Sequence, residues 1–352
     1  MTESTPTRIG FVGSGNIAGP YAGSIARHPE LKLVGVFDLD QSKAATFAGE
    51  HSCEAFETLA ALVAAVDIVV NLTSAPYHYS STRELLELGI PVFSEKPLAL
   101  SYDEAKELVD LAEQAGIPLA SAPSLWLGRS YIAAAERLRA GEIGTVRLVT
   151  AEVHQGRIET WHPAPHSFYQ VGPVADVGVY PLTYLTAVLG PIRQVSAVAT
   201  KVLPQRTTKD GVPFEIAVAD AWFVTAVFES GAVLRLSCDY YIASATVPRS
   251  MDLHGDSGSL RIDDWIMPGA VIERAEFGEA YTPEPEGEKI ELDWSLGVLD
   301  FAQAIADGTA HRNSAAHAAH VVEILQAVSA SAARGQVVEV TSSFPSPFDP
   351  VS

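Results

Sequence analysis

Two groups of side chains in this sequence have types and spacings that could do chemistry. The first is Lys96, which follows the apolar run 91–94 and Glu95 and is itself followed by Pro97. Pro97 ends a strand because proline has no N–H for the ladder, and a lysine at the end of a buried strand needs a partner because a lone buried ammonium is costly. In open α/β sheets this edge binds ligands. We therefore predict that Lys96 faces a ligand, the alternative being a surface lysine beside a helix-start glutamate.

The second group is Asp176 and Tyr180, which lie four residues apart in an otherwise apolar predicted helix. Side chains at that spacing share one helical face. The plain alternative is an N-cap aspartate and a buried tyrosine whose hydroxyl finds a partner. A phenol has an ordinary pKa of about 10, so it needs a nearby cation to act as a base near neutral pH. We take Lys96 as that cation and predict that Lys96, Asp176 and Tyr180 are catalytic.

A long loop, 154–169, is rich in histidine and aromatic residues. Long loops are usually functional, and aromatic faces with hydrogen-bonding edges suit a sugar or polyol. A metal site at His154, His162 and His166 is a weaker hypothesis, because prolines separate them and no carboxylate spacing supports it. His317 and His320 are expected to lie on a solvated or packed helix face. The predicted substrate-binding residues are Trp126, Trp161, His162 and Tyr169.

A turn of the form Gly-x-Gly-x-x-Ala follows the apolar run 8–12 and opens a predicted helix. Gly13 permits the tight turn, Gly15 lets the backbone approach a pyrophosphate, and Ala18 allows close helix–strand packing. The helix N-terminus offers N–H groups to phosphates. Asp38 ends the next strand twenty positions after Ala18 and can accept both hydrogen bonds of a ribose diol while repelling a 2′-phosphate. We predict NAD as the cofactor, in preference to NADP.

Strands alternate with helices through residue 122. Strands are predicted at 8–12, 31–37, 67–72, 91–94 and 119–122, with helices at 18–28, 41–51, 58–65, 79–88 and 102–115. This alternation predicts a doubly wound parallel sheet, a Rossmann domain spanning 1–122.

The pattern changes after Pro123. A helix at 131–140 is followed by runs typical of strands at 146–153, 195–201, 217–228, 232–241, 250–254 and 289–292, and by helices at 296–307 and 315–334. We predict an α+β domain spanning 123–352, with a mainly antiparallel open sheet that carries helices on one face. The proline-rich tail 344–352 is expected to be a docked arm or a loosely ordered end.

These motifs resemble those of the glucose–fructose oxidoreductase / inositol dehydrogenase / MocA family. The matching positions are Gly13, Gly15 and Ala18, the turn Thr73/Pro76/His78, and Glu95/Lys96/Pro97. The resemblance implies that Lys96 reaches the nicotinamide ribose and the substrate hydroxyl, that the Lys96–Pro97 bond is cis, and that the open sheet face pairs in dimers or tetramers. The family carries Asp-x-Gly-x-His at 176–180, with tyrosine in the histidine slot in its glucose–fructose oxidoreductase and dihydrodiol/xylose dehydrogenase branches. This chain has the tyrosine version. The implied cofactor-binding residues are Gly13, Ser14, Gly15, Asn16, Ile17, Asp38, Thr73, Ser74, Pro76, His78, Glu95 and Lys96.

Composition excludes several classes of protein. A net charge of −20 argues against a nucleic-acid or anionic-membrane partner. The two cysteines, Cys53 and Cys238, lie far apart without metal-ligand spacing, which argues against a disulfide framework or a zinc site. The polar N-terminus lacks a signal-peptide h-region and no apolar run could span a bilayer, so we expect a cytoplasmic protein.

The leading functional hypothesis is an NAD(P)-dependent oxidoreductase acting on a secondary alcohol or ketone of a sugar, inositol or related polyol. Tyr180 would exchange the hydroxyl proton, Lys96 would lower the pKa of Tyr180, and Asp176 would orient Lys96 or the substrate. One alternative is an NAD-dependent glycoside-cleaving enzyme of the same fold. Another is a non-catalytic dinucleotide-sensing regulator, which would not need all three residues. The sequence leaves open the substrate, the direction of reaction and the choice between homodimer and homotetramer.

Overall fold

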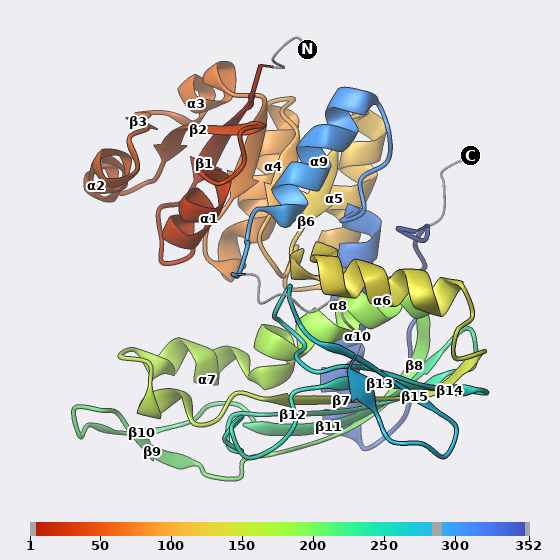
Figure 1. Cartoon of the computed structure of the whole chain (residues 1–352). Coiled ribbons are helices and arrows are strands. Elements are labelled where there is room, and N and C mark those ends of the chain that lie inside the picture. The colour runs from red at the N-terminus through yellow and green to blue at the C-terminus, as the bar shows by residue number, and fades with distance from the viewer. Residues whose placement is uncertain (1–4, 284–290, 349–352) are drawn as a thin grey trace. The chain divides into compact units, whose positions relative to one another are not determined.

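The computed structural model describes residues 5–283 and 291–348 and divides into two compact units. The first unit comprises Met1–Leu125, Leu292–Val322 and Ser343–Ser352, and the second comprises Trp126–Glu291 and Glu323–Ser342. Figure 1 traces the chain through both.

The first unit is built on a sheet of six parallel strands in the order β3-β2-β1-β4-β5-β6. Parallel strands joined by helices bury the sheet on both faces, and this confirms the predicted doubly wound fold. The strands are β1 (Thr7–Val12), β2 (Leu31–Phe37), β3 (Glu54–Ala55), β4 (Ile68–Asn71), β5 (Val92–Ser94) and β6 (Leu119–Ser121). The helices are α1 (Ala18–Ile25), α2 (Gln41–His51), α3 (Leu59–Ala65), α4 (His78–Glu87) and α5 (Tyr102–Ala115), with short 3₁₀ turns η1 (Ala75–Tyr77) and η2 (Leu125–Leu127).

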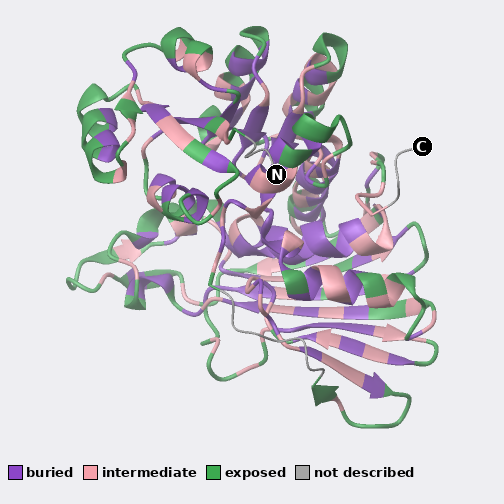
Figure 2. Cartoon of the chain, turned by 45° about the horizontal axis from the view of Figure 1, so that its top comes forward, coloured by how far each residue is buried: buried purple, intermediate pink, exposed green. Residues whose placement is uncertain are grey.

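Two apolar clusters fill the two faces of this sheet. One packs α1 and α2 on the sheet through Tyr21 and Phe47, and the other packs α3, α4 and α5 through Leu62, Leu85 and Leu108. Helix α5 is capped by Ser101, whose hydroxyl accepts a hydrogen bond from the Glu104 N–H at 3.3 Å. Strands β4, β5 and β6 are buried along their whole length, whereas β2 and β3 are partly exposed; Figure 2 colours the chain by burial.

The N-terminal part of the first unit ends at Leu125, close to the predicted boundary at residue 122, but the unit also takes in C-terminal segments that we assigned to the second domain. Helix α9 (Leu296–Asp307), which we assigned to the second domain, contributes Val298, Phe301 and Ala302 to the core of the first unit. The start of α10 (Ala315–Arg334) packs there too. The predicted helices 296–307 and 315–334 are therefore correct in extent, but periodicity alone cannot say which sheet an apolar helix face covers. Phe344 of the tail stacks on His317, 4.1 Å between ring centroids, so this part of the tail is docked, while 349–352 lie outside the described residues.

The second unit contains a nine-stranded sheet in the order β16-β15-β14-β13-β7-β12-β11-β8-β17. Every pairing is antiparallel except that between β7 and β12, which makes the sheet mixed. Buried and exposed residues alternate along these strands, so one face is packed and the other open (Figure 2). The strands are β7 (Val146–His154), β8 (Ile192–Thr200), β11 (Ala221–Phe228), β12 (Val233–Asp239), β13 (Met251–Gly255), β14 (Gly258–Ile262), β15 (Ile272–Glu276), β16 (Thr282–Pro283) and β17 (Val338–Glu339).

Helices and one hairpin complete the second unit. The predicted helix 131–140 is α6 (Arg129–Arg139), and α7 (Phe168–Val171), α8 (Val179–Leu189) and the short turns η3 (Ile158–Thr160) and η4 (Pro165–Ser167) follow. A separate hairpin pairs β9 (Gln205–Thr207) with β10 (Pro213–Glu215) and was not predicted, because strands of three residues carry too little periodicity. The predicted strand 289–292 is not formed at 291–292, and 289–290 lie outside the described residues.

Candidate functional site

The glycine-rich turn between β1 and α1 has room for a ligand on one side and none on the other. Gly13 has φ +97°, and a Cβ there would lie 2.8 Å from the backbone carbonyl of Leu72, so only glycine fits. A Cβ at Gly15 would meet nothing within 4 Å. Helix α1 begins at Ala18, and no described side chain caps it at Ile17. This open turn at a helix N-terminus is the arrangement that accepts a pyrophosphate.

Asp38 is fixed beside this turn at the end of β2. Its Oδ2 accepts hydrogen bonds from the Ser14 N–H at 2.8 Å and the Ser14 hydroxyl at 2.7 Å, and its Oδ1 accepts one from the Asp40 N–H at 2.9 Å. Partial burial alone would raise the pKa of Asp38, but the bonds from Asp40 and Ser14 outweigh it and lower that pKa. An ionised carboxylate is therefore held where a ribose diol binds in folds of this type.

The Thr73–His78 turn is held from inside the first unit. Asn71 is fully buried, and its Oδ1 accepts from the Thr73 N–H at 3.2 Å and from the Thr73 hydroxyl at 2.8 Å. The buried His78 ring lies with Nδ1 2.7 Å from the Pro97 carbonyl and Nε2 2.8 Å from the Thr73 carbonyl. We expected His78 among the cofactor-binding residues, and its ring joins this turn to the Glu-Lys-Pro turn. Ser74 and Pro76, also expected there, are exposed.

The Glu95-Lys96-Pro97 turn is anchored through its glutamate. Glu95 is buried, its Oε1 accepts from the Tyr21 hydroxyl of α1 at 2.7 Å, and its Oε2 accepts from the Lys96 N–H at 2.9 Å. The Lys96–Pro97 bond is cis, as the resemblance implied. The carboxylate thus ties the end of β5 to the helix that begins at the glycine-rich turn. The residues of this edge fit a dinucleotide: a glycine cradle, a helix N-terminus and a fixed carboxylate.

In the second unit, Asp176 lies in a π-helical turn, η5 (Val174–Gly178), rather than in the regular helix that we predicted from residue 176. The regular helix, α8, begins only at Val179. The four-residue spacing to Tyr180 therefore spans a change of helix type. Asp176 Oδ2 accepts a 2.7 Å hydrogen bond from the hydroxyl of Tyr240, just beyond the end of β12. π-turns are rare and occur frequently at functional sites.

Tyr180 lies at the start of α8 and is 9% exposed. Its ring packs at 5.9 Å between centroids on Trp265, which the sequence did not single out. Trp265 is itself buried under the guanidinium of Arg249, whose Cζ lies 4.9 Å from the ring centroid. A tyrosine between an apolar helix and an indole has its ring direction restricted by packing.

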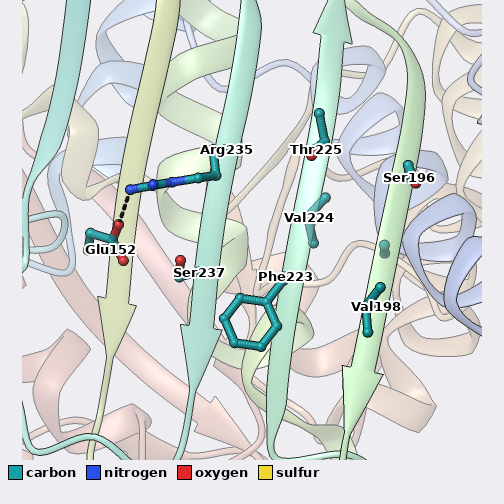
Figure 3. A pocket seen from close by; sticks show the side chains of 9 residues that line it. Glu152, Ser196, Val198, Phe223, Val224, Thr225, Arg235 and Ser237 are labelled. Atoms are coloured by element: carbon teal, nitrogen blue, oxygen red, sulfur yellow. Dashed lines mark hydrogen bonds and ion pairs between the residues drawn. The ribbon is translucent and has the colours of Figure 1, made fainter.

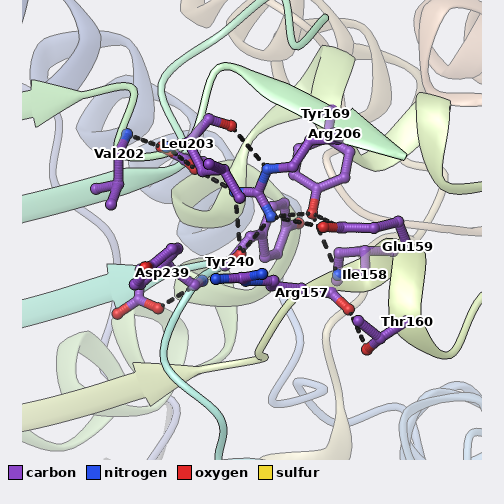
Figure 4. Close-up of polar contacts among 12 residues, drawn as sticks. Arg157, Ile158, Glu159, Thr160, Tyr169, Val202, Leu203, Arg206, Asp239 and Tyr240 are labelled. Atoms are coloured by element: carbon purple, nitrogen blue, oxygen red, sulfur yellow. Dashed lines mark hydrogen bonds and ion pairs between the residues drawn. The ribbon is translucent and has the colours of Figure 1, made fainter. Parts of the chain in front are cut away.

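A buried ionic network lies next to this region (Figure 4). The Arg206 guanidinium has no exposed surface and forms ion pairs with Glu159, at 2.9 Å, and with Asp220. Its Nη1 also donates to the Tyr169 hydroxyl at 3.1 Å. One cation thus joins the loop after β7, the β9–β10 hairpin and the start of β11. Sequence patterning did not single out Arg206, Asp220 or Tyr240.

Two of the four residues expected to bind substrate are buried. Tyr169 is 2% exposed, donates its hydroxyl hydrogen bond to Glu159 and accepts one from the Ile158 N–H at 3.2 Å. Trp126 is 3% exposed. The expectation for Tyr169 rested on its place in an aromatic loop. Its hydroxyl, however, already forms hydrogen bonds with Glu159, the Ile158 N–H and Arg206. We therefore reassign Tyr169 to support of the loop.

The other two lie on a more open aromatic cluster. Trp161 is 46% exposed, and its ring contacts His162 at 5.5 Å and Phe168 at 6.0 Å between centroids. His162 Nδ1 accepts a 3.0 Å hydrogen bond from the Ala164 N–H. A neutral imidazole that accepts at Nδ1 carries its proton on Nε2, which makes Nε2 a donor rather than a base.

Comparison with known proteins assigns the chain to a family. Residues 7–122 match the model of the oxidoreductase family with an NAD-binding Rossmann fold, and residues 131–261 match the GFO/IDH/MocA C-terminal domain. The chain belongs to the GFO/IDH/MocA oxidoreductase family. The fold, the enzyme class and the NAD-type cofactor predicted from the motifs are thereby confirmed.

Three relatives illustrate the range of this family. D-glucoside 3-dehydrogenase of Escherichia coli (strain K12) is 26% identical over 249 residues, 67% of this chain and 71% of the relative. Trans-1,2-dihydrobenzene-1,2-diol dehydrogenase of Bos taurus is 25% identical over 306 residues, 83% of this chain and 84% of the relative. Levoglucosan dehydrogenase, solved in complex with NADH and L-sorbose, shares the fold with a TM-score of 0.82 at 18% identity, covering 96% of this chain and 99% of that chain.

Two further features concern possible ligands and membranes. Within 5–283 and 291–348, no three histidine, cysteine or acidic side chains are grouped to hold a metal ion. No helix in the described part of the chain is both long enough and apolar enough to cross a bilayer.

His317 and His320 are buried against Phe344, so they form a packed helix face.

A second buried ion pair lies at the ends of β7 and β12. His154 Nδ1 is 2.5 Å from Asp239 Oδ2, and its Nε2 is 3.2 Å from Glu152 Oε2. Burial alone would lower the pKa of His154, but the hydrogen bonds and charges of Asp239 and Glu152 outweigh it and raise that pKa to about 9. Asp239 Oδ1 also accepts the N–H groups of Tyr241 and Ile242, at 2.8 and 2.6 Å, and so shapes the turn next to Tyr240.

This pair predicts a pH-dependent stability. Because the folded pKa of His154 lies above its ordinary value of 6.5, its contribution is fully present below pH 6.5 and is lost as the pH rises through 9. The thermal unfolding temperature of the wild type should therefore fall between pH 6.5 and 9.5 by more than that of His154→Gln. His166→Gln, at an exposed histidine of the same loop, is the control and should follow the wild type. Parallel wild-type and His154→Gln curves over this range would contradict the assignment.

Proposed function

We propose that this protein is an NAD-dependent dehydrogenase that oxidises a secondary alcohol of a sugar, inositol or related polyol, or reduces the corresponding ketone. The proposal is carried by one observation: a carboxylate in a π-turn, Asp176, is followed by a packed tyrosine, Tyr180, in a chain whose first unit has an NAD-type glycine turn. The named activities of the relatives, dehydrogenases of a glucoside and of a diol, support the substrate class.

The cofactor would be held by the glycine-rich turn and by Asp38. NAD, when bound, supplies the hydride acceptor for oxidation. The Gly13–Ile17 segment would receive its phosphates at the start of α1, and Asp38 would accept hydrogen bonds from the ribose diol. Thr73, Ser74 and the Glu95–Lys96 pair would border the cofactor site, as the family motifs imply.

Oxidation of the alcohol requires the loss of a hydride from carbon and of a proton from its hydroxyl. We assign the proton to Tyr180, which takes it in oxidation and returns it in reduction. Lys96 would favour the phenolate by its charge, and Asp176 would orient Lys96 or the substrate. The assignment of Lys96 rests on the Glu-Lys-Pro motif, and that of Tyr180 on its slot in the family motif.

The competing proton acceptor, His162, is better suited to substrate binding. Its Nδ1 is taken by the Ala164 N–H, so its Nε2 donates in the neutral ring. Trp161 and Phe168 beside it offer aromatic faces to the C–H face of a sugar. We therefore assign Trp161 and His162 to substrate binding.

We further propose that the open sheet face pairs with a second copy of this chain. Residues of β7, β12, β11 and β8 on this face line a depression of about 430 Å³, and their side chains are drawn in Figure 3. Val198 and Phe223, opposite each other on β8 and β11, are 65% and 55% exposed. Beside them Arg235 donates to Glu152 at 2.6 Å. Exposed apolar side chains aligned across strands are typical of a protein–protein interface, and the family resemblance implies one here.

The cofactor preference should follow Asp38. Wild type should bind NADH more tightly than NADPH. Asp38→Ser should reduce the ratio of the two affinities, because the carboxylate that repels a 2′-phosphate is removed. Asp40→Asn removes a charge two residues away while keeping a side chain that can cap α2, so it should keep the preference of wild type. Fluorescence titration of both cofactors measures this. A wild type that prefers NADPH would refute the role of Asp38.

Tyr180→Phe keeps the ring on Trp265 but deletes the hydroxyl. If Tyr180 carries the proton, turnover should fall by about 100-fold or more, while His162→Asn should mainly raise the substrate KM. Steady-state kinetics on the best substrate from a panel of sugars, inositols and glycosides measure both, with folding checked by thermal unfolding. A nearly active Tyr180→Phe together with an inactive His162→Asn would move the proton transfer to the loop.

Phe223→Glu should dissociate the oligomer, because a carboxylate on the open face cannot be buried without a partner. Phe277→Glu is the matched control, since Phe277 is 88% exposed in the turn between β15 and β16 and should leave the mass unchanged. Size-exclusion chromatography with light scattering gives the mass of each. A monomeric wild type, or a Phe223→Glu variant of unchanged mass, would exclude pairing through this face.

A further inference from the structure

Tyr240 has no part in the proposed reaction, yet its hydroxyl donates a hydrogen bond to Asp176, which does have a proposed role. The side chain is fully buried, so it cannot touch a substrate, and its hydroxyl donates to Asp176 Oδ2 at 2.7 Å. Burial, and next the charge of Asp176, raise the pKa of Tyr240 well above the ordinary value for a phenol. The phenol therefore stays protonated and remains a donor at every pH at which an enzyme works.

The backbone of Tyr240 is fixed on both sides. Its N–H donates to the Asp220 carbonyl at 2.8 Å, and its own carbonyl accepts from both terminal nitrogens of Arg206 at 3.4 Å. Its ring meets the Tyr169 ring edge to face, 5.6 Å between centroids. These contacts restrain the position of the Tyr240 hydroxyl. A rotation of the Asp176 carboxylate would therefore break its hydrogen bond to that hydroxyl.

Asp176 lies in the π-turn that precedes the regular helix α8. The π-turn Val174–Gly178 widens the helix for one turn before α8 begins. The hydrogen bond from the Tyr240 hydroxyl to Oδ2 limits how far the carboxylate can turn, and with it the direction of Oδ1.

We propose that Tyr240 is a positioning residue: it holds the Asp176 carboxylate in one orientation and transmits to it the fixed geometry of the Arg206 network. This inference rests on the proposed role of Asp176 in the dehydrogenase reaction. It assigns a catalytic consequence to a tyrosine 64 residues away in sequence. The network around Arg206, in turn, supports the reaction through Tyr240 and not only the stability of the loop.

Tyr240→Phe tests this with little change in packing, since it keeps the ring against Tyr169. Tyr184→Phe is the matched control, because Tyr184 is 1% exposed and its hydroxyl donates to the Tyr131 carbonyl at 3.2 Å, away from Asp176. Both variants lose one buried tyrosine hydrogen bond and should lose similar thermal stability. Only Tyr240→Phe should lower kcat, by about tenfold, with a smaller change in KM.

Two readouts separate positioning from a purely structural effect. Site-specific replacement of Tyr240 by 4-aminophenylalanine, a weaker donor of nearly the same shape, should lower kcat, but by less than Tyr240→Phe does. In an Asp176→Asn background, Tyr240→Phe should have little further effect on kcat and a reduced effect on the unfolding temperature.

Several outcomes would overturn the inference. One is a Tyr240→Phe variant whose kcat matches that of Tyr184→Phe. Another is additive effects of Tyr240→Phe and Asp176→Asn on both activity and unfolding. If Tyr240→Phe does not fold, the 4-aminophenylalanine variant decides, and a kcat equal to that of wild type counts against the inference. A wild type that oxidises no sugar or polyol overturns the proposed function itself, and the inference with it, whereas failure of the variants in an active wild type overturns the inference alone.

Discussion

Charge that is buried must be paired, and this constraint orders the segments around Asp176. A lone guanidinium such as that of Arg206 would be too costly in the interior, so the loop after β7 and the start of β11 each bring a carboxylate to it, Glu159 and Asp220. The backbone of Tyr240 is held in the same network. His154 and Asp239 form a second pair next to it. The segments that carry the candidate chemistry are thus joined by interactions that lose much of their worth if any one partner is removed.

In the first unit, buried contacts hold the segments around the glycine-rich turn in place while the turn itself stays open. Gly13 closes against Leu72, Glu95 bonds to Tyr21, and the His78 ring joins the Thr73 and Pro97 carbonyls. These contacts lie beneath the edge where the cofactor is expected, and through them residues of the family motifs hold the turns in place. A motif of this kind combines binding residues with the residues that hold them.

Much of this could be predicted from the sequence, and the limits have physical causes. The glycine turn, Asp38 and the strand–helix alternation are local signals, because each depends on neighbours within about 30 residues. Tyr240 was missed because its partner, Asp176, lies on another element, and β-strand periodicity does not reveal which tyrosine is bonded. The π-turn has no signal in spacing, so Asp176 and Tyr180 were placed on one regular helix. Tyr169 was taken for a substrate residue because sequence cannot distinguish an exposed aromatic loop residue from one that covers a buried arginine.

The central claim is that hydride passes directly between a sugar carbon and the nicotinamide. The most direct measurement is isotope transfer: a substrate deuterated at the reacting carbon is incubated with the enzyme and NAD, and the reduced cofactor is analysed by mass spectrometry and NMR. The account predicts one deuterium at C4 of the nicotinamide, in released cofactor and in proportion to oxidised sugar. Deuterium that returns to the sugar with cleavage of a glycosidic bond, and no net reduced cofactor, would instead indicate the glycoside-cleaving alternative. No transfer to the nicotinamide from any sugar or polyol would contradict the account.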